Sequence, residues 1–177
     1  MKSALIIYKS KTGFTKKYVD WILEDVKCSV TTLDKAKKSD IDKYDIVIYG
    51  AGVHAGHIAG LKKFNKLVDY NKKKVIIFAT GAAPNAEEIV NPIIDVNIGS
   101  NNADVEFFYM EAGICYENMG FFARGLMRAF SKMLKAKKDK TDIEKGMSEA
   151  LMTSFDNSKK ENIEPLIASL KKYLNNE

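Results

Sequence analysis

The length and composition of the chain argue against several classes of protein. Its 177 residues, 46% of them hydrophobic, can bury the core of one ordinary domain, and we expect a single domain over residues 1–177. There are only two cysteines, no C-x-x-C pair and no apolar run near the roughly 20 residues that span a bilayer, so we expect neither a disulfide scaffold nor export nor a membrane span. The predicted location is a reducing cytoplasm.

The net charge of +5 comes from one segment of the chain. Residues 119–140 hold seven basic side chains and a single acidic one, Asp139, whereas the rest of the chain is almost balanced. A local cationic surface indicates a specific partner rather than general nucleic-acid binding, so we expect no nucleic-acid partner.

Apolar segments of strand length alternate with amphipathic helical patterns. In chain order, the pattern predicts a strand at 3–8, a helix at 19–26, strands at 28–33 and 45–51, a helix at 61–68, a strand at 74–80, a helix at 89–94, a strand at 105–110 and a helix at 163–174. Pro92 indicates a late start or a kink in its helix, whereas Pro165 fits the first turn of the last helix. Residues 34–43 are polar and fit either an irregular helix or a loop.

Strands that are apolar on both faces and alternate with helices predict a parallel sheet covered on both sides, a doubly wound α/β fold. The alternation stops at residues 111–160. About fifty residues separate the last strand from the last helix there, although about five would suffice. We therefore expect a helical insertion at about 114–158.

A turn rich in hydroxyl groups follows the first strand and leads into a helix. Its residues are Ser10, Lys11, Thr12, Gly13, Phe14 and Thr15. Such a turn suits a phosphate, because helix N-terminal amides and hydroxyls donate, Gly13 allows close approach, and Lys11 can add charge. A Ser/Thr-capped turn without a ligand fits these six residues equally well.

These residues match the [ST]-x-T-G-x-T loop with which flavodoxins hold the phosphate of FMN, at the same place after the first strand. The chain thus resembles the flavodoxin family, over five βα units and an insertion after the fifth strand like that of long-chain members. The resemblance implies a five-stranded parallel sheet of order 2-1-3-4-5, helices on both faces and non-covalently bound FMN. The menaquinone-dependent protoporphyrinogen dehydrogenases are the branch most similar in basic composition and basic insert.

Two further loops are expected to meet the flavin, because ligands in this topology lie at the carboxyl ends of the strands. They comprise Gly52, Val53, His54, Ala55, Gly56 and His57 after the third strand, and Thr80, Gly81, Ala82 and Ala83 after the fourth. The resemblance implies that the first loop flanks the ring, with a glycine carbonyl able to turn toward reduced flavin, and that the second donates backbone hydrogen bonds to the pyrimidine edge. Glycines that only form tight turns are the alternative.

Histidines stand where many flavodoxins place a stacking aromatic residue. His54 and His57 could stack, donate to reduced flavin or titrate near neutrality, or could be solvated without a role. Trp21 lies off the apolar stripe of its helix, which predicts packing at a surface or interface. Tyr116, between the fifth strand and the insert, is the candidate for a wall of the pocket. We predict no catalytic residue and no metal site.

Residues 119–138 form a strongly amphipathic helical pattern. Its apolar stripe comprises Phe122, Ala123, Leu126, Met127, Phe130, Met133 and Leu134. The opposite side carries Arg124, Arg128, Lys132 and Lys135, with Phe121 isolated among them. The pattern fits peripheral contact with an anionic membrane through residues 121–140, or a cover over a hydrophobic substrate. A helix packed on its own domain fits as well.

Three functions remain open. The first is electron transfer between protein partners through FMN, although flavodoxins are usually acidic and the insert has the opposite sign. The second is a dehydrogenase that passes electrons from a hydrophobic substrate to a quinone, which predicts a cytoplasmic protein associated with a membrane. The third is a flavin-free binding module, against which the intact phosphate loop argues.

Overall fold

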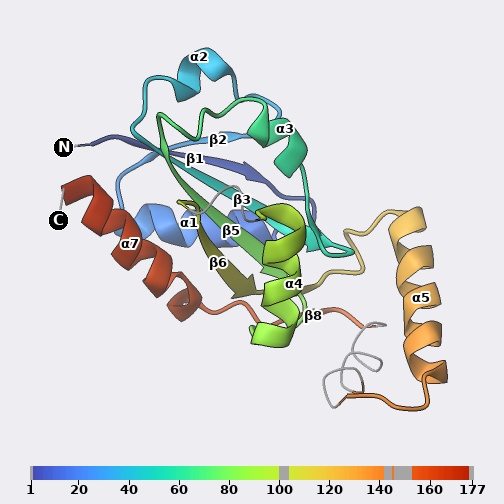
Figure 1. The fold of residues 1–177 in the computed structure, drawn as a ribbon. Helices are drawn as coiled ribbons and strands as arrows, with labels where there is room; N and C mark the ends of the chain where they lie inside the picture. Colours follow the sequence, from blue (N-terminus) through green and yellow to red (C-terminus); the bar gives the residue numbers. More distant parts are fainter. Residues whose placement is uncertain (1, 100–103, 142–144, 146–152, 176–177) are drawn as a thin grey trace.

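A parallel sheet forms the centre of the computed structural model, which describes residues 2–99, 104–141, 145 and 153–175. Its strands are β1 (Ala4–Lys9), β2 (Ser29–Thr32), β3 (Ile46–His54), β5 (Lys74–Gly81) and β6 (Glu106–Glu111). They pair in the order β2-β1-β3-β5-β6, which is the expected order when only the parallel strands are counted (Figure 1). The loops after β1, β3 and β5 therefore meet at one edge of the sheet.

The helices other than the one in the insertion cover the two faces of the sheet. The described helices are α1 (Phe14–Asp25), α2 (Lys38–Ile41), α3 (Leu61–Asn65), α4 (Glu87–Asn97), α5 (Phe121–Ala136) and α7 (Glu164–Asn175), with a 3-10 turn, η2 (Lys160–Ile163), before α7. Val47 and Tyr49 of β3 pack in one apolar core with residues of α2, α3 and α4, whereas Ile46 and Ile48 pack in the other with α1 and α7. Successive side chains of a strand alternate between faces, which explains the unbroken apolar runs in the sequence.

The helix boundaries settle the predictions that involve proline. Pro92 lies inside α4, which begins at Glu87, so the proline does not delay the start of the helix. Pro165 lies in the first turn of α7, as expected. Residues 34–43 contain the short helix α2, which confirms the irregular-helix interpretation. No helix in the described part of the chain is long and apolar enough to span a bilayer.

Trp21 packs at the surface of α1, in agreement with the sequence. Its ring meets that of Tyr18 edge to face with 5.3 Å between centroids, and the Lys17 ammonium lies 5.0 Å from the Trp21 ring centre. The half-buried indole therefore packs against the edge of the core that contains Tyr18.

The insertion leaves and rejoins the domain at one point. β7 (Gly113–Ile114) pairs antiparallel with β8 (Phe155–Asp156). α5, which lies between these two strands in the chain, stands apart from the central sheet (Figure 1). The two short strands are so close that a Cβ on Gly113 would lie 1.9 Å from the Phe155 carbonyl oxygen. The expected helical insertion after the last parallel strand is confirmed.

Candidate functional site

The loop after β1 enters α1 through a glycine with a left-handed backbone. Gly13 has φ 99°, which a residue with a side chain rarely adopts, and its carbonyl accepts the Lys17 amide at 2.9 Å. No side chain caps α1 at Gly13, its N-cap. Among the described residues, none accepts a hydrogen bond from the amides of residues 12–15, so these amides can donate to a ligand.

A buried hydrogen bond joins this loop to the end of β5. The hydroxyl oxygens of Thr15 and Thr80 lie 2.9 Å apart, and neither residue is more than 4% exposed. Thr15 therefore directs its hydroxyl to Thr80, which leaves its amide as the group available to a phosphate. The side chains of Ser10 and Thr12 are only half-buried.

The loop after β5 is held in place by the neighbouring strand β6. The Tyr109 hydroxyl donates to the Ala83 carbonyl at 2.9 Å, and the Ala112 amide donates to the Gly81 carbonyl at 2.7 Å. Burial, reinforced by the charge of Glu111, raises the pKa of Tyr109, so its hydroxyl remains a protonated donor at neutral pH.

Glu111 completes this support. Its carboxylate accepts the Asn85 amide at 2.7 Å, and its carbonyl accepts the Tyr18 hydroxyl. The Ala82 and Ala83 amides, by contrast, have no acceptor in the described part of the chain. The loop can therefore offer two adjacent amides to a ligand, the kind of donors that the resemblance implies.

The glycine-rich loop after β3 forms a tight hairpin. β4 (His57–Ile58) folds back on the end of β3, so Val53 stands opposite Ile58 and His54 opposite His57. Because directly opposed residues project to the same side of a hairpin, the two histidines share one side.

The turn of this hairpin is formed by Ala55 and Gly56, with φ of 49° and 78°. Two positive values are typical of the type I′ turns that join two-residue hairpins. The Gly52 carbonyl accepts the Ala59 amide at 3.0 Å, and the Gly56 carbonyl accepts the side-chain amide of Asn97 at 2.7 Å. Both glycine carbonyls thus have protein donors, whereas the resemblance implied a carbonyl able to turn.

His54 lies close enough to the loop after β1 to respond to its charge. Partial burial of the imidazole, and secondly the charge of Lys11, lower the pKa of His54 below its ordinary value of 6.5. The ring is therefore neutral at pH 7, with one nitrogen able to donate and the other to accept.

A cavity of about 680 Å³ lies beside the loop after β1. Its lining comprises Tyr8, Lys9, Ser10, Lys11, Thr12, Gly13, Lys16, Thr32, Asp34 and Asn118. Three lysines against one carboxylate suit an anion. The predicted residues of the other two loops do not line it, so the cavity covers the phosphate end of the candidate site rather than the whole site.

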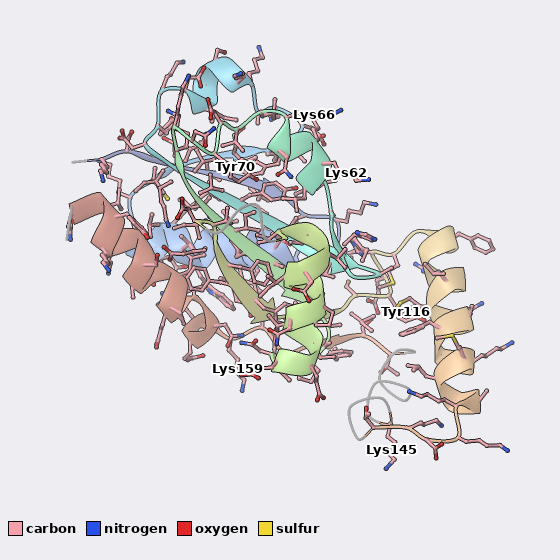
Figure 2. The ribbon with its side chains drawn as sticks, in the orientation of Figure 1. Lys62, Lys66, Tyr70, Tyr116, Lys145 and Lys159 are labelled. Carbon is pink, nitrogen blue, oxygen red and sulfur yellow. The ribbon has the colours of Figure 1, made fainter. Side chains whose placement is uncertain are left out.

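Tyr116 lies between α5 and the body of the protein (Figure 2). It packs with Ile114 and Leu134 in an apolar cluster that also includes Ala82 of the loop after β5. Tyr116 does not line the cavity beside the loop after β1, so its role as a wall of the flavin pocket stays a prediction.

Sequence reasoning missed the side chains that hold these loops: Asn97, Tyr109 and Glu111, together with Asn118 in the cavity. Their partners are distant in the chain and are brought near by strand pairing, so no local spacing marks them. The one available signal was Glu111, a carboxylate at the end of an apolar strand. In the described part of the chain, no three potential metal ligands cluster.

Comparison with known proteins identifies the family. Residues 5–141, well over half of the chain, match the family model of the flavodoxin domain. The curated proteins gave no match. Among solved structures, the chain is similar to a protein from Bacteroides eggerthii classed with the flavoproteins, at 17% identity and a TM-score of 0.51, over 77% of this chain and 100% of that one.

Two further structures are more distant. One is a flavoprotein from Lactobacillus acidophilus in complex with FMN, at 18% identity and a TM-score of 0.42, over 63% of this chain and 93% of that one. The other is oxidised flavodoxin 2 from Bacillus cereus, at 19% identity and a TM-score of 0.44, over 62% and 84%. The finer likeness to protoporphyrinogen dehydrogenases stays a prediction. The family match and the sheet order together show that the chain belongs to the flavodoxin family.

Proposed function

We propose that this chain transfers electrons between protein partners through non-covalently bound FMN. FMN is the cofactor that the family indicates, and when bound it supplies the acceptance and release of electrons. The protein's part is to bind and orient it. The amides of residues 12–15 and the charge of Lys11 suit the phosphate, and the Ala82 and Ala83 amides suit the polar edge of the ring.

The observation that carries this proposal is the set of amide donors at two strand ends that a buried hydrogen bond ties together. Gly13 gives α1 no side-chain cap. The Ser10 hydroxyl accepts the Lys16 amide of the first turn at 3.4 Å, so the loop itself satisfies that amide and leaves those of residues 12–15 to a ligand. The Thr15–Thr80 hydrogen bond holds the two loops next to each other, which supports a single site for their donors. A phosphate and a polar ring edge are the groups such donors match.

The experiment is reconstitution with FMN. The purified chain is mixed with FMN, excess flavin is removed by gel filtration, and the absorbance spectrum is recorded before and after anaerobic photoreduction. We expect flavin bands that stay with the protein, bleach on reduction and return in air. A protein that emerges colourless would refute FMN binding and leave the binding-module alternative.

A second function, oxidation of a hydrophobic substrate with electron transfer to a membrane quinone, is favoured by the surface of α5. The predicted apolar stripe is divided in the structure: Leu134 is buried, but Leu126 and Met133 are 59% and 60% exposed, and Phe121 is 93% exposed. The side chains of Phe122 and Ala123 lie outside the described residues. The outward side of α5 thus combines apolar and cationic groups, which suits an anionic lipid surface.

The cationic side of α5 also differs from the sequence prediction. Arg124 turns back, and its Nε donates to the Met119 carbonyl at 3.0 Å, so it supports the entry to α5 instead of facing a partner. Arg128, Lys132 and Lys135 remain exposed.

Vesicle sedimentation tests the membrane contact. We expect the protein to sediment with vesicles of phosphatidylcholine and phosphatidylglycerol but not with phosphatidylcholine alone. Arg128→Glu with Lys132→Glu should lower the bound fraction at least about tenfold, since each basic residue near an anionic surface contributes about 1 kcal/mol. The matched control is Lys171→Glu with Lys172→Glu, exposed on α7. Equal binding by both double variants, or none by the parent protein, would remove the membrane contact.

A further inference from the structure

We propose that Asn97 is a positioning residue that sets the conformation of the β3–β4 hairpin, and through it the redox potential of the flavin. The inference rests on the proposed FMN binding. Asn97 is the last residue of α4, outside all three loops of the candidate site. Its side chain nevertheless contacts the hairpin at Gly56 in the turn and at Ile58 in β4.

The contacts of Asn97 use both ends of its side-chain amide. Its Nδ2 donates to the Gly56 carbonyl at 2.7 Å and to the Ile93 carbonyl of its own helix at 2.8 Å. Its Oδ1 accepts the Ile58 amide at 2.8 Å. The bond to Ile93 fixes the side chain on α4, and the other two bonds fix one carbonyl and one amide of the hairpin.

The hairpin needs such support because its turn is not favourable by itself. Ala55 has φ 49°, a left-handed conformation that is unfavourable for a residue with a Cβ. Gly56, with φ 78°, adopts either hand of backbone at little cost, so local sequence does not fix the orientation of the peptide that follows it. The Asn97 amide is the group that holds the Gly56 carbonyl in its observed direction.

This direction matters for the flavin because reduction adds an N–H donor to the ring. The resemblance implies that this loop flanks the ring, so a hairpin carbonyl free to rotate would accept from that donor and would stabilise the reduced form. The bond from Asn97 engages the Gly56 carbonyl instead. Asn97 therefore favours one arrangement of the hairpin in both redox states and keeps the potential lower than a free hairpin would.

The test compares Asn97→Ala with Asn91→Ala. Asn91 is an exposed residue of the same helix, so the two variants share the change in helix propensity but only the first loses the hairpin contacts. For Asn97→Ala we expect faster hydrogen exchange at the Ile58 amide in the protein without flavin. We also expect weaker binding of oxidised FMN, by about three- to tenfold, because the hairpin must be ordered on binding. Asn91→Ala should match the parent protein in both.

The redox potential separates positioning from general support. Asn97→Ala should shift the two-electron midpoint potential of bound FMN to more positive values, by about 30 mV for each tenfold preference gained by the reduced form. The inference would be overturned if Asn97→Ala had the same midpoint potential as the parent protein. It would also be overturned if Asn91→Ala accelerated exchange of the Ile58 amide as much as Asn97→Ala does. If the parent protein binds no FMN, the proposed function fails instead, and the exchange experiment still shows whether Asn97 holds the hairpin.

Discussion

At the scale of single residues, the Thr15–Thr80 pair shows how the site depends on buried polar contacts. Each hydroxyl is removed from water and has the other as its hydrogen-bond partner, 2.9 Å away. A pair of this kind adds little net stability, but removing one partner leaves the other unsatisfied.

This asymmetry gives a prediction for valine, which has the shape of threonine without its hydroxyl. Thr15→Val should lower the free energy of unfolding by about 1–3 kcal/mol, because the Thr80 hydroxyl is left buried without a partner. The double variant Thr15→Val with Thr80→Val should recover most of that loss. Urea unfolding of the four proteins of this cycle measures both effects. If the double variant lost as much free energy of unfolding as the two single variants combined, the two hydroxyls would not depend on each other.

At the scale of elements, α7 is attached to the sheet by a charged cluster at the amino ends of β5 and β6. The Glu106 carboxylate accepts hydrogen bonds from Ser169 and Tyr173 of α7 and pairs with Lys74 at 3.0 Å. Burial raises the pKa of Glu106, but the hydrogen bonds from Ser169, Tyr173 and Lys74 together outweigh it, so the pKa lies below its ordinary value of 4.5.

The lowered pKa of Glu106 fixes the direction of a pH effect. A carboxyl group with a depressed pKa in the folded state contributes stability above its unfolded pKa, and this contribution is lost as pH falls through the folded pKa. Glu106→Gln should therefore reduce the free energy of unfolding at pH 7, on the order of 1 kcal/mol, and the difference from the parent should shrink below about pH 4.5. Urea unfolding at pH 7 and pH 3 measures this, with exposed Glu161→Gln as control. A difference that stays constant with pH would contradict the assigned role of the charge.

At the scale of the whole molecule, the insertion is attached through neighbouring strands and is otherwise set apart from the sheet. Ile114 stands opposite Phe155 in the antiparallel β7–β8 ladder, so a two-residue turn can connect these two residues directly. The apolar cluster around Leu134 joins the insertion to Ala82 of the candidate site.

Replacement of residues 115–154 by an Asn-Gly turn should therefore leave the central sheet folded. We expect an unchanged sheet signal in circular dichroism and a loss of sedimentation with anionic vesicles. FMN affinity should fall by no more than about tenfold, because the pocket loses contacts at Ala82 and at Asn118 but keeps the amide donors of both loops. A variant that unfolds would show that the sheet needs the insertion, and one that still binds vesicles would place the membrane contact elsewhere.

Local sequence patterns predicted the parts of this protein that depend on local structure. The strands and the turn around Gly13 were recognisable because apolar periodicity and turn composition act within a few residues. The hairpin itself was not predicted, since pairing of His54 with His57 depends on a positive φ at Ala55 that composition does not predict. Asn97 was missed because its role exists only once α4 packs beside β4.

The hydrogen bond between Thr15 and Thr80 also constrains the order of events during synthesis. A ribosome exposes the loop after β1 long before it exposes the end of β5, and β3 must pair between them before the two threonines can meet. A nascent chain that ends before residue 80 therefore lacks both the partner of Thr15 and the second set of amide donors. Flavin capture should accordingly be a late event, and a shortage of cofactor should act on completed chains rather than on those still being made.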